Sequence, residues 1–261
     1  MNSILFDIGA TKTRIAFSEN GEFFEEPKVF KTSENYDEAL KMFVETAKIL
    51  AGDGKIKKVV GGMSRSVKGL PYEKFKEDLK MAFSAEVAVE NDAAMVGLGE
   101  ANFGAGRGFE IVAYITVSTG VGGVRIVNGK IDETTIGFEP GKQIMDIDSG
   151  KTLEDMISGR ALQAKTGKHP KEITDEAVWD EHAKILAIGL NNIIVEWSPS
   201  CVVLGGSMIT GNPCIPLDKT REHLKEILKI FPEIPPIKKG ELGDFGGLYG
   251  ALAYLKEIVR F

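Results

Sequence analysis

Cysteine, histidine and long apolar runs are all scarce in this chain of 261 residues. The two cysteines, Cys201 and Cys214, are interpreted as reduced packing residues, which is typical of a cytoplasmic protein. The three histidines are scattered and show no metal-ligand spacing. No apolar run approaches the length that spans a bilayer, and Met1–Ser3 leads into a predicted strand without a signal peptide. These absences argue against a membrane protein and against a disulfide framework.

A basic surface is missing as well. The formal net charge is −6, and no dense block of lysine and arginine occurs anywhere. A nucleic-acid partner is therefore not expected, because phosphate neutralisation needs a basic face. The chain is 43% hydrophobic and 27% charged, which is ordinary for a soluble globular protein. Its length allows one large domain or two modest ones, each with its own core.

The most informative stretch of the sequence is 114–129, "YITVSTGVGGVRIVNG". It reads as a strand (114–117), a turn rich in glycine and hydroxyls (118–123), a second strand (124–127) and an Asn128-Gly129 hairpin signal. Such a turn exposes several backbone N–H groups at one point, and its glycines let an anion approach the main chain. A plain tight hairpin is the alternative interpretation.

The same design occurs near the N-terminus, in "FDIGATKTRIAFSENG". Residues 9–16 align without a gap to residues 120–127, and an Asn-Gly pair follows each copy. An internal repeat of strand, turn and strand predicts two related lobes. Two anion-binding turns from opposite lobes would form a nucleotide clamp, which we favour over two coincidental hairpins.

Strands and helices alternate around the two hairpins, which predicts an α/β protein of two lobes with a ligand site in the cleft between them. Further strands are expected at 58–60, 86–89 and 201–204. Helices are expected at 36–50, 73–83, 93–100, 153–165, 178–193, 217–231 and 246–259.

Seven motifs in order, "DIGATKTRIA", "VENDAAMVGLGE", "TVSTGVGG", "GFEPG", "LEDMISGRAL", "VVLGGSMI" and "GGLYGALA", cover nearly the whole chain. With them the chain resembles the ROK family of sugar kinases, within the actin-like and hexokinase-like ATPase superfamily. The resemblance implies a two-lobed actin-like/ribonuclease H-like ATPase fold. It also implies a small lobe (1–112) completed by the last helix (246–261), a large lobe (113–245), and nucleotide and sugar sites in the interlobe cleft.

The resemblance implies a cytoplasmic, homodimeric kinase that transfers the γ-phosphate of ATP to a hydroxyl of a hexose or hexosamine. Whether polyphosphate can replace ATP is left open. Asp7 would hold hydrated Mg²⁺ against ATP, although an Asx turn is its alternative role. The phosphate-binding residues would be Gly9, Thr11 and Lys12 in one lobe and Ser118, Thr119, Gly120 and Gly122 in the other, with Gly205 and Gly206 beside the adenosine. Lys12 could equally be a solvated charge, and a strand-to-helix turn needs glycine at 205–206 anyway.

Asn91-Asp92 is the sharpest candidate for chemistry. Phosphoryl transfer to an alcohol needs a carboxylate that accepts the hydroxyl proton, and a strand-to-helix junction holds such a group rigidly. Asp92 is therefore predicted as the general base, against the alternative of a simple helix N-cap. By resemblance, Asn91 would bind a sugar hydroxyl, and Glu139 and Glu154 would chelate neighbouring hydroxyls. Glu154 could instead be a first-turn charge favoured by the helix dipole.

The chain departs from the family at two places near the expected sugar. Lys142 stands where the family has a zinc-binding histidine, and Thr152 stands where its last zinc cysteine belongs, so no zinc is expected. Residues 62–66, which include Ser64 and Arg65, replace a Gly-x-Pro-Gly stretch. Lys142 together with Arg65 or Lys68 suggests an acceptor with an anionic substituent, unless these side chains are merely solvated.

Two other classes of function remain open. A sugar-sensing regulator of the same family would carry an N-terminal DNA-binding segment, whereas this sequence starts at the first strand. A non-catalytic nucleotide- and sugar-binding regulatory or scaffold protein would show no turnover with a broad panel of sugars, and the presence of Asp92 argues against it.

Overall fold

The computed structural model describes residues 1–64, 67 and 69–258, and the chain divides into two compact units. Unit 1 comprises residues 1–103 and the chain from Leu242 onward, and unit 2 comprises Gly104–Glu241. The boundary expected at 112/113 lies nine residues later than this division, inside a strand that starts at Ile111. The other expected boundary, 245/246, lies four residues after the one in the structure.

Unit 1 is built on a five-stranded mixed sheet, in the order β3-β2-β1-β4-β5. Strand β1 (Ser3–Ile8) is antiparallel to β2 (Lys12–Ser18), which is antiparallel to β3 (Lys28–Lys31). Strands β4 (Lys58–Met63) and β5 (Glu86–Asn91) continue the sheet parallel to β1. The carboxyl ends of three parallel strands therefore meet at one edge of the sheet.

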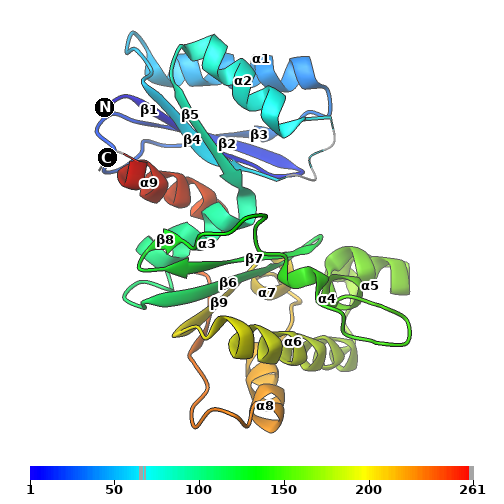
Figure 1. The fold of residues 1–261 in the computed structure, drawn as a ribbon. Coiled ribbons are helices and arrows are strands. Elements are labelled where there is room, and N and C mark those ends of the chain that lie inside the picture. The colour runs from blue at the N-terminus through cyan, green and yellow to red at the C-terminus, as the bar shows by residue number, and fades with distance from the viewer. Residues whose placement is uncertain (65–66, 68, 259–261) are drawn as a thin grey trace. The chain divides into compact units, whose positions relative to one another are not determined.

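Helices cover both faces of this sheet (Figure 1). Helices α1 (Tyr36–Ala51) and α2 (Tyr72–Phe83) bury apolar side chains against one face, to which β1 contributes Phe6 and Ile8. Helices α3 (Asp92–Phe103) and α9 (Gly246–Ile258) pack on the other face, after a short 3₁₀ turn (Gly243–Phe245). Because side chains alternate along a strand, Asp7 belongs to the α3/α9 face.

Helices α3 and α9 pack at very short range because glycines line their contact. A side chain at Gly250 would collide with the Met95 carbonyl, and one at Gly99 would collide with the Gly246 carbonyl. Helix α9 is thereby fixed against the rest of unit 1, although residues 104–245 separate it from α3 in the sequence.

Unit 2 repeats the same topology, in the sheet order β10-β9-β6-β7-β8. Strands β6 (Ile111–Val117), β7 (Val121–Val127) and β8 (Lys130–Ile131) are antiparallel in sequence, and β9 (Cys201–Gly205) and β10 (Ile237–Lys239) extend the sheet parallel to β6. The predicted Asn128-Gly129 turn joins β7 to β8, and both residues have positive φ, as a type I′ turn requires.

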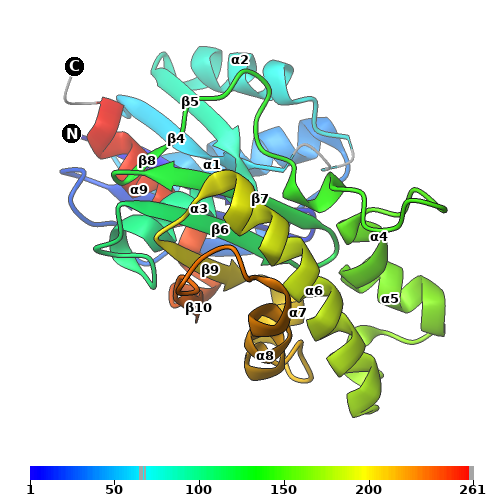
Figure 2. The same ribbon diagram turned by 60° about the horizontal axis from the view of Figure 1, so that its bottom comes forward.

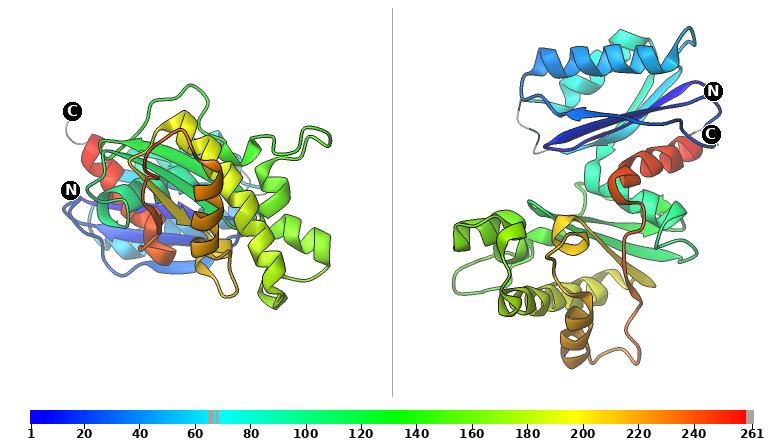
Figure 3. Two further views of the ribbon diagram at one scale, coloured as in Figure 1. Left: turned by 90° about the horizontal axis from the view of Figure 1, so that it is seen from below. Right: turned by 180° about the vertical axis from the view of Figure 1, so that it is seen from behind.

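The helices of unit 2 are α4 (Leu153–Ile157), α5 (Gly159–Thr166), α6 (Glu176–Trp197), α7 (Ser207–Thr210) and α8 (Leu217–Ile227), with 3₁₀ turns at Pro140–Lys142 and Pro170–Glu172. Figures 2 and 3 show α6 and α8 side by side under the sheet of unit 2, where their apolar faces form its core with alternate residues of β6. Of the helices that the structure describes, none combines the length and apolar character needed to cross a bilayer.

The two hairpins of the repeat are not aligned residue for residue. Ile8 pairs with Thr13 across the first turn, whereas Val117 pairs with Val121 across the second, so the turns contain four and three residues. The ungapped alignment of 9–16 with 120–127 is therefore wrong in detail. It matched the glycines and ignored the difference in turn length.

The helix predicted at 153–165 is broken into α4 and α5 at Ser158. This residue has an extended backbone (φ −68°, ψ 155°), and its side chain accepts a hydrogen bond from the Ala161 N–H, which caps α5. The break lets the Gly159 N–H donate to the Ser118 carbonyl at 2.7 Å. The start of α5 is thereby attached to the glycine-rich turn of unit 2.

Candidate functional site

The carboxyl edge of the unit 1 sheet collects the sequence-predicted catalytic residues. Ile8, Met63 and Asn91 lie side by side in the register of β1, β4 and β5. The Ser64 N–H then donates to the Ile8 carbonyl at 3.0 Å, which holds the chain after β4 against the end of β1. Polar side chains at the ends of parallel strands converge at such an edge, which is a common place for binding sites.

Asp92 lies partly buried at the junction of β5 and α3. Its Oδ1 accepts the Ala93 N–H at 2.9 Å, and the Ser64 hydroxyl donates to the same carboxylate. Burial raises the pKa of Asp92, and the hydrogen bonds from the backbone and from Ser64 offset only part of that rise. Gly62 leaves room for this residue, since an added Cβ would lie 3.1 Å from the Asp92 Cα.

The helix N-cap is supplied by the neighbouring residue. Asn91 Oδ1 accepts the Ala94 N–H, three residues on, at 3.2 Å, which is the bond of an N-cap side chain. The alternative interpretation of Asp92 as the cap of this helix is therefore weakened, because Asn91 fills that role. The amide nitrogen of Asn91 stays chemically suited to donate to a ligand hydroxyl.

Asp7 is a buried carboxylate on the α3/α9 face. Its Oδ2 receives the Arg14 Nη1 at 2.9 Å, and Arg14 lies directly opposite Asp7 in the β1–β2 register. Burial raises the pKa of Asp7 to about 6, against the opposing effect of Arg14 and with a further rise from the charge of Asp92. Gly247 at the start of α9 packs on it so closely that an added Cβ would lie 2.7 Å from the Asp7 carboxyl carbon.

The first glycine turn, residues 9–11, joins β1 to β2. Ala10 and Thr11 are exposed, and Gly9 is partly buried. The Gly9 N–H donates to the Lys12 carbonyl at 3.0 Å. The Lys12 side chain is 53% exposed and lies 3.2 Å from the Asp244 carboxylate, to which Arg14 also extends at 3.5 Å. Lys12 was expected either to bind phosphate or to be a solvated charge. In the structure it forms an exposed ion pair with Asp244.

The second glycine turn, Ser118–Gly120, is held from below by Glu154 of α4. The Val121 N–H donates to Glu154 Oε2 at 2.8 Å, and an added Cβ at Gly120 would lie 2.6 Å from the same oxygen. Within the turn, the Ser118 N–H donates to the Gly120 carbonyl at 2.8 Å. Thr119 is exposed at its tip, and Gly122 lies partly buried at the start of β7. A side chain at position 120 would therefore displace the Glu154 carboxylate from the turn.

Glu154 is also the acceptor of two cations. Lys142 Nζ lies 2.7 Å and Arg160 Nη2 lies 3.2 Å from its Oε1. Burial raises the pKa of Glu154, but Lys142, the Val121 N–H and Arg160 together hold that pKa below its ordinary value. The same pair raises the pKa of Lys142. Glu139, the other predicted carboxylate, is exposed beside the 3₁₀ turn.

Gly205 and Gly206 end β9 and lead into α7. An added Cβ at Gly205 would collide with the Tyr114 hydroxyl, and one at Gly206 would collide with the Val117 carbonyl. Gly206 also has φ +87°, which side-chain-bearing residues rarely adopt. Packing and backbone conformation thus explain both glycines.

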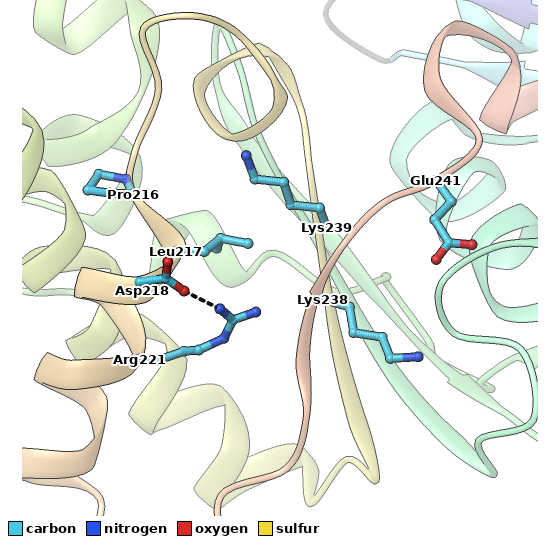
Figure 4. Close-up of a pocket in the computed structure, with 7 residues that line it drawn as sticks. All are labelled: Pro216, Leu217, Asp218, Arg221, Lys238, Lys239 and Glu241. Carbon is cyan, nitrogen blue, oxygen red and sulfur yellow. Dashed lines mark hydrogen bonds and ion pairs between the residues drawn. The ribbon is translucent and has the colours of Figure 1, made fainter.

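The hollow in Figure 4 lies elsewhere on unit 2 and has a volume of about 630 Å³. None of the predicted site residues lines it. Arg221 is paired there with Asp218 at 2.6 Å, and Lys238 and Lys239 point to opposite sides of β10. Lys238 in turn donates to the Ala105 carbonyl at 3.0 Å. The cationic side chains that line the hollow thus do not converge on one point. We therefore do not regard the hollow as the functional site.

Arg65 and Lys68 lie outside the described residues. In the part of the chain that the structure describes, histidine, cysteine, aspartate and glutamate form no group of three or more that could hold a metal ion.

The sequence analysis did not identify four residues that contact these predicted site residues: Arg14, Thr32, Arg160 and Asp244. A signal existed for Arg14, because an antiparallel hairpin after Asp7 places a residue of β2 beside it. The others come from distant segments, for which the sequence carries no local signal.

Comparison with known proteins gives the same architecture. The chain is 27% identical to the N-acetyl-D-glucosamine kinase of Haemophilus influenzae, over 95% of this chain and 97% of that protein. It superposes on the ROK hexokinase of Thermus thermophilus with a TM-score of 0.81 and 24% identity, over the full length of both chains. A ROK family glucokinase from Streptomyces griseus, solved with glucose and AMPPNP, gives a TM-score of 0.75 and 20% identity, over 98% of this chain and all of that one.

The fold is thus that of the ROK sugar kinases, as the motifs indicated. The model of the ROK family matches residues 4–258, which is nearly the whole sequence. The chain belongs to the ROK family.

Proposed function

We propose that this protein is an ATP-dependent sugar kinase that phosphorylates a hydroxyl of a hexose or hexosamine. The observation that carries the proposal is Asp92, a partly buried carboxylate with a raised pKa, fixed by Ala93 and Ser64 while Asn91 caps the helix. Because the cap bond comes from Asn91, the Asp92 carboxylate is not needed to cap the helix. The names of the kinase relatives, and the sugar and ATP analogue in the Streptomyces griseus complex, support the same reaction.

In the proposed reaction the acceptor hydroxyl forms a bond to the γ-phosphorus of ATP while the bond from that phosphorus to the β,γ-bridging oxygen breaks. ADP leaves with the electron pair of that bond, and the hydroxyl proton passes to the Asp92 carboxylate. A raised pKa suits this role, because a base is most effective when its pKa approaches the working pH. Ser64, as a donor to the same carboxylate, helps to hold it in place.

The two glycine turns are the proposed phosphate-binding segments. Gly9, Thr11 and Lys12 would contact the outer phosphates from unit 1. The corresponding set in unit 2 is Ser118, Thr119, Gly120 and Gly122, with Gly205 and Gly206 near the adenosine. Lys12 would then exchange its exposed ion pair with Asp244 for a phosphate, a small loss because exposed pairs contribute little.

The donor set around Asp7 fits a magnesium ion. Magnesium prefers carboxylate and water oxygens, and Asp7 is a buried carboxylate whose pKa burial raises to about 6, against the opposing effect of Arg14. Asp7 would hold the ion through its water shell, beside the outer phosphates. When bound, Mg²⁺ neutralises the negative charge that develops on the transferring phosphoryl group.

The acceptor is proposed to be an uncharged sugar. Asn91, Asp92, Ser64, Glu139, Glu154 and Lys142 are the proposed contacts to its hydroxyls. Lys142 was the main reason to expect an anionic substituent, yet its charge is already paired with Glu154 at 2.7 Å. With Glu139 and Asp155 also nearby, the cluster offers no uncompensated positive charge from Lys142.

A coupled assay of ATP consumption across hexoses, hexosamines and sugar acids tests the function, with polyphosphate as an alternative donor. We expect turnover with at least one neutral hexose or hexosamine and none with the Asp92→Asn variant. Binding of ATP and sugar without turnover would instead favour a regulatory protein of the same family. We also propose that the enzyme is cytoplasmic and forms a homodimer. Light scattering after size-exclusion chromatography tests the dimer.

A further inference from the structure

Thr32 lies just after β3, the edge strand of unit 1, and belongs to no motif of the sequence. It is 6% exposed, and its hydroxyl lies 2.9 Å from the Gly9 carbonyl and 3.0 Å from the Thr13 hydroxyl. Its backbone N–H also donates to the Thr11 carbonyl at 3.1 Å. One residue thus contacts the first glycine turn at both of its ends.

The direction of these hydrogen bonds can be worked out. The Gly9 carbonyl can only accept, so the single hydroxyl proton of Thr32 goes to it. The Thr13 hydroxyl must then be the donor in its contact with Thr32. The result is a buried chain from Thr13 to Thr32 to Gly9 in which every proton has one place.

This arrangement orients the turn. In a planar trans peptide the carbonyl and the N–H of the next residue point in opposite directions. Because Thr32 holds the carbonyls of Gly9 and Thr11, the N–H groups of Ala10 and Lys12 point away from β3. No described residue accepts a hydrogen bond from the Ala10 N–H outside regular strands and helices.

We infer that Thr32 is a positioning residue, which aims the backbone N–H groups of the Gly9–Thr11 turn at the phosphates of ATP. The inference rests on the proposed function, since it takes this turn as a phosphate site. Thr32 does not contact the phosphates itself in this account. It removes the freedom of the turn to rotate its peptides away from the ligand.

The test replaces Thr32 by valine, which keeps the shape and loses the hydroxyl. The KM for ATP should rise roughly tenfold, the scale expected when a buried carbonyl loses its donor, while kcat and the KM for the sugar stay within about twofold. Thr32→Ser restores the hydroxyl and should return the KM for ATP to near the wild-type value. Thr220→Val is the control, because Thr220 of α8 is also buried, but its hydroxyl donates to the carbonyl of Pro216, the residue before that helix, and not to a glycine turn.

A second readout needs no ATP. Hydrogen exchange of the Gly9 N–H, which donates to the Lys12 carbonyl, should quicken in Thr32→Val and not in Thr220→Val. An unchanged KM for ATP, or a serine variant as impaired as the valine variant, would overturn the inference. A wild-type protein that binds no ATP overturns the proposed function instead. The exchange of Gly9 then still decides whether Thr32 holds the turn.

Discussion

Asp7→Asn should stabilise the protein against unfolding while it destroys nucleotide binding. Burial raises the pKa of Asp7 from its ordinary 3.8 to about 6, so the folded state takes up a proton more readily than the unfolded state. Stability is therefore lost as pH rises from 3.8 to 6 and stays low above that. At 1.36 kcal/mol per pH unit, the ionised group costs about 3 kcal/mol at neutral pH. Asparagine keeps the shape, keeps an acceptor for Arg14 and cannot ionise.

The assay is urea unfolding followed by far-UV circular dichroism at pH values from 4 to 8. Both tryptophans, Trp179 and Trp197, lie in unit 2, so their fluorescence is an internal control for a change in unit 1. The variant's advantage over wild type should be small at pH 4 and approach about 3 kcal/mol by pH 7. Asp244→Asn, at an exposed partner of Arg14, should show no such gain. An advantage that does not depend on pH would refute the reasoning.

Three further predictions concern the site. Glu154→Gln keeps an acceptor for the Val121 N–H but loses the charge that pairs with Lys142. The KM for the sugar should therefore rise roughly 10- to 100-fold, more than the KM for ATP. Equal rises in the two KM values would contradict this prediction. Because burial raises the pKa of Asp92 and only the ionised base accepts a proton, kcat/KM should fall as pH drops through that raised pKa, and a rate that stays flat down to pH 4 would be inconsistent. Metal analysis of the dialysed protein should find no zinc, and one tightly bound zinc per chain would disprove that prediction.

Much of the fold could be predicted because local patterns decide it. The helix at 36–50 and the strand at 86–89 were located within two residues, since apolar periodicity and end signals agree there. Strands β3, β8 and β10 and helix α7 were missed. They are two to four residues long, and β3, with the sequence "KVFK", is too exposed to show an alternating apolar pattern.

The site was predictable only where one motif carries the residues. Asp7 lies one residue before the end of β1 and Asp92 directly follows β5, each within a recognisable pattern, and the parallel register brings those strand ends to one edge. The contacts between distant segments were not predictable. Glu154 reaches Val121 from 33 residues away, and Asp244 reaches Lys12 from 232 residues away. The role of Thr32 could not be predicted, because a threonine at the end of a strand is common and only its hydrogen bonds to the glycine turn distinguish it.

Kinetics of Asp92→Asn test the central claim most directly. Asparagine is nearly isosteric, and the cap of α3 belongs to Asn91, so the fold and the glycine turns should be unaffected. The amide cannot accept the acceptor's proton, which should lower kcat by about 10²–10⁴, or roughly 3–5 kcal/mol of barrier. The affinity for ATP should stay close to wild type, and the KM for the sugar should change less than kcat. A variant that keeps near-normal turnover would show that Asp92 is not the base.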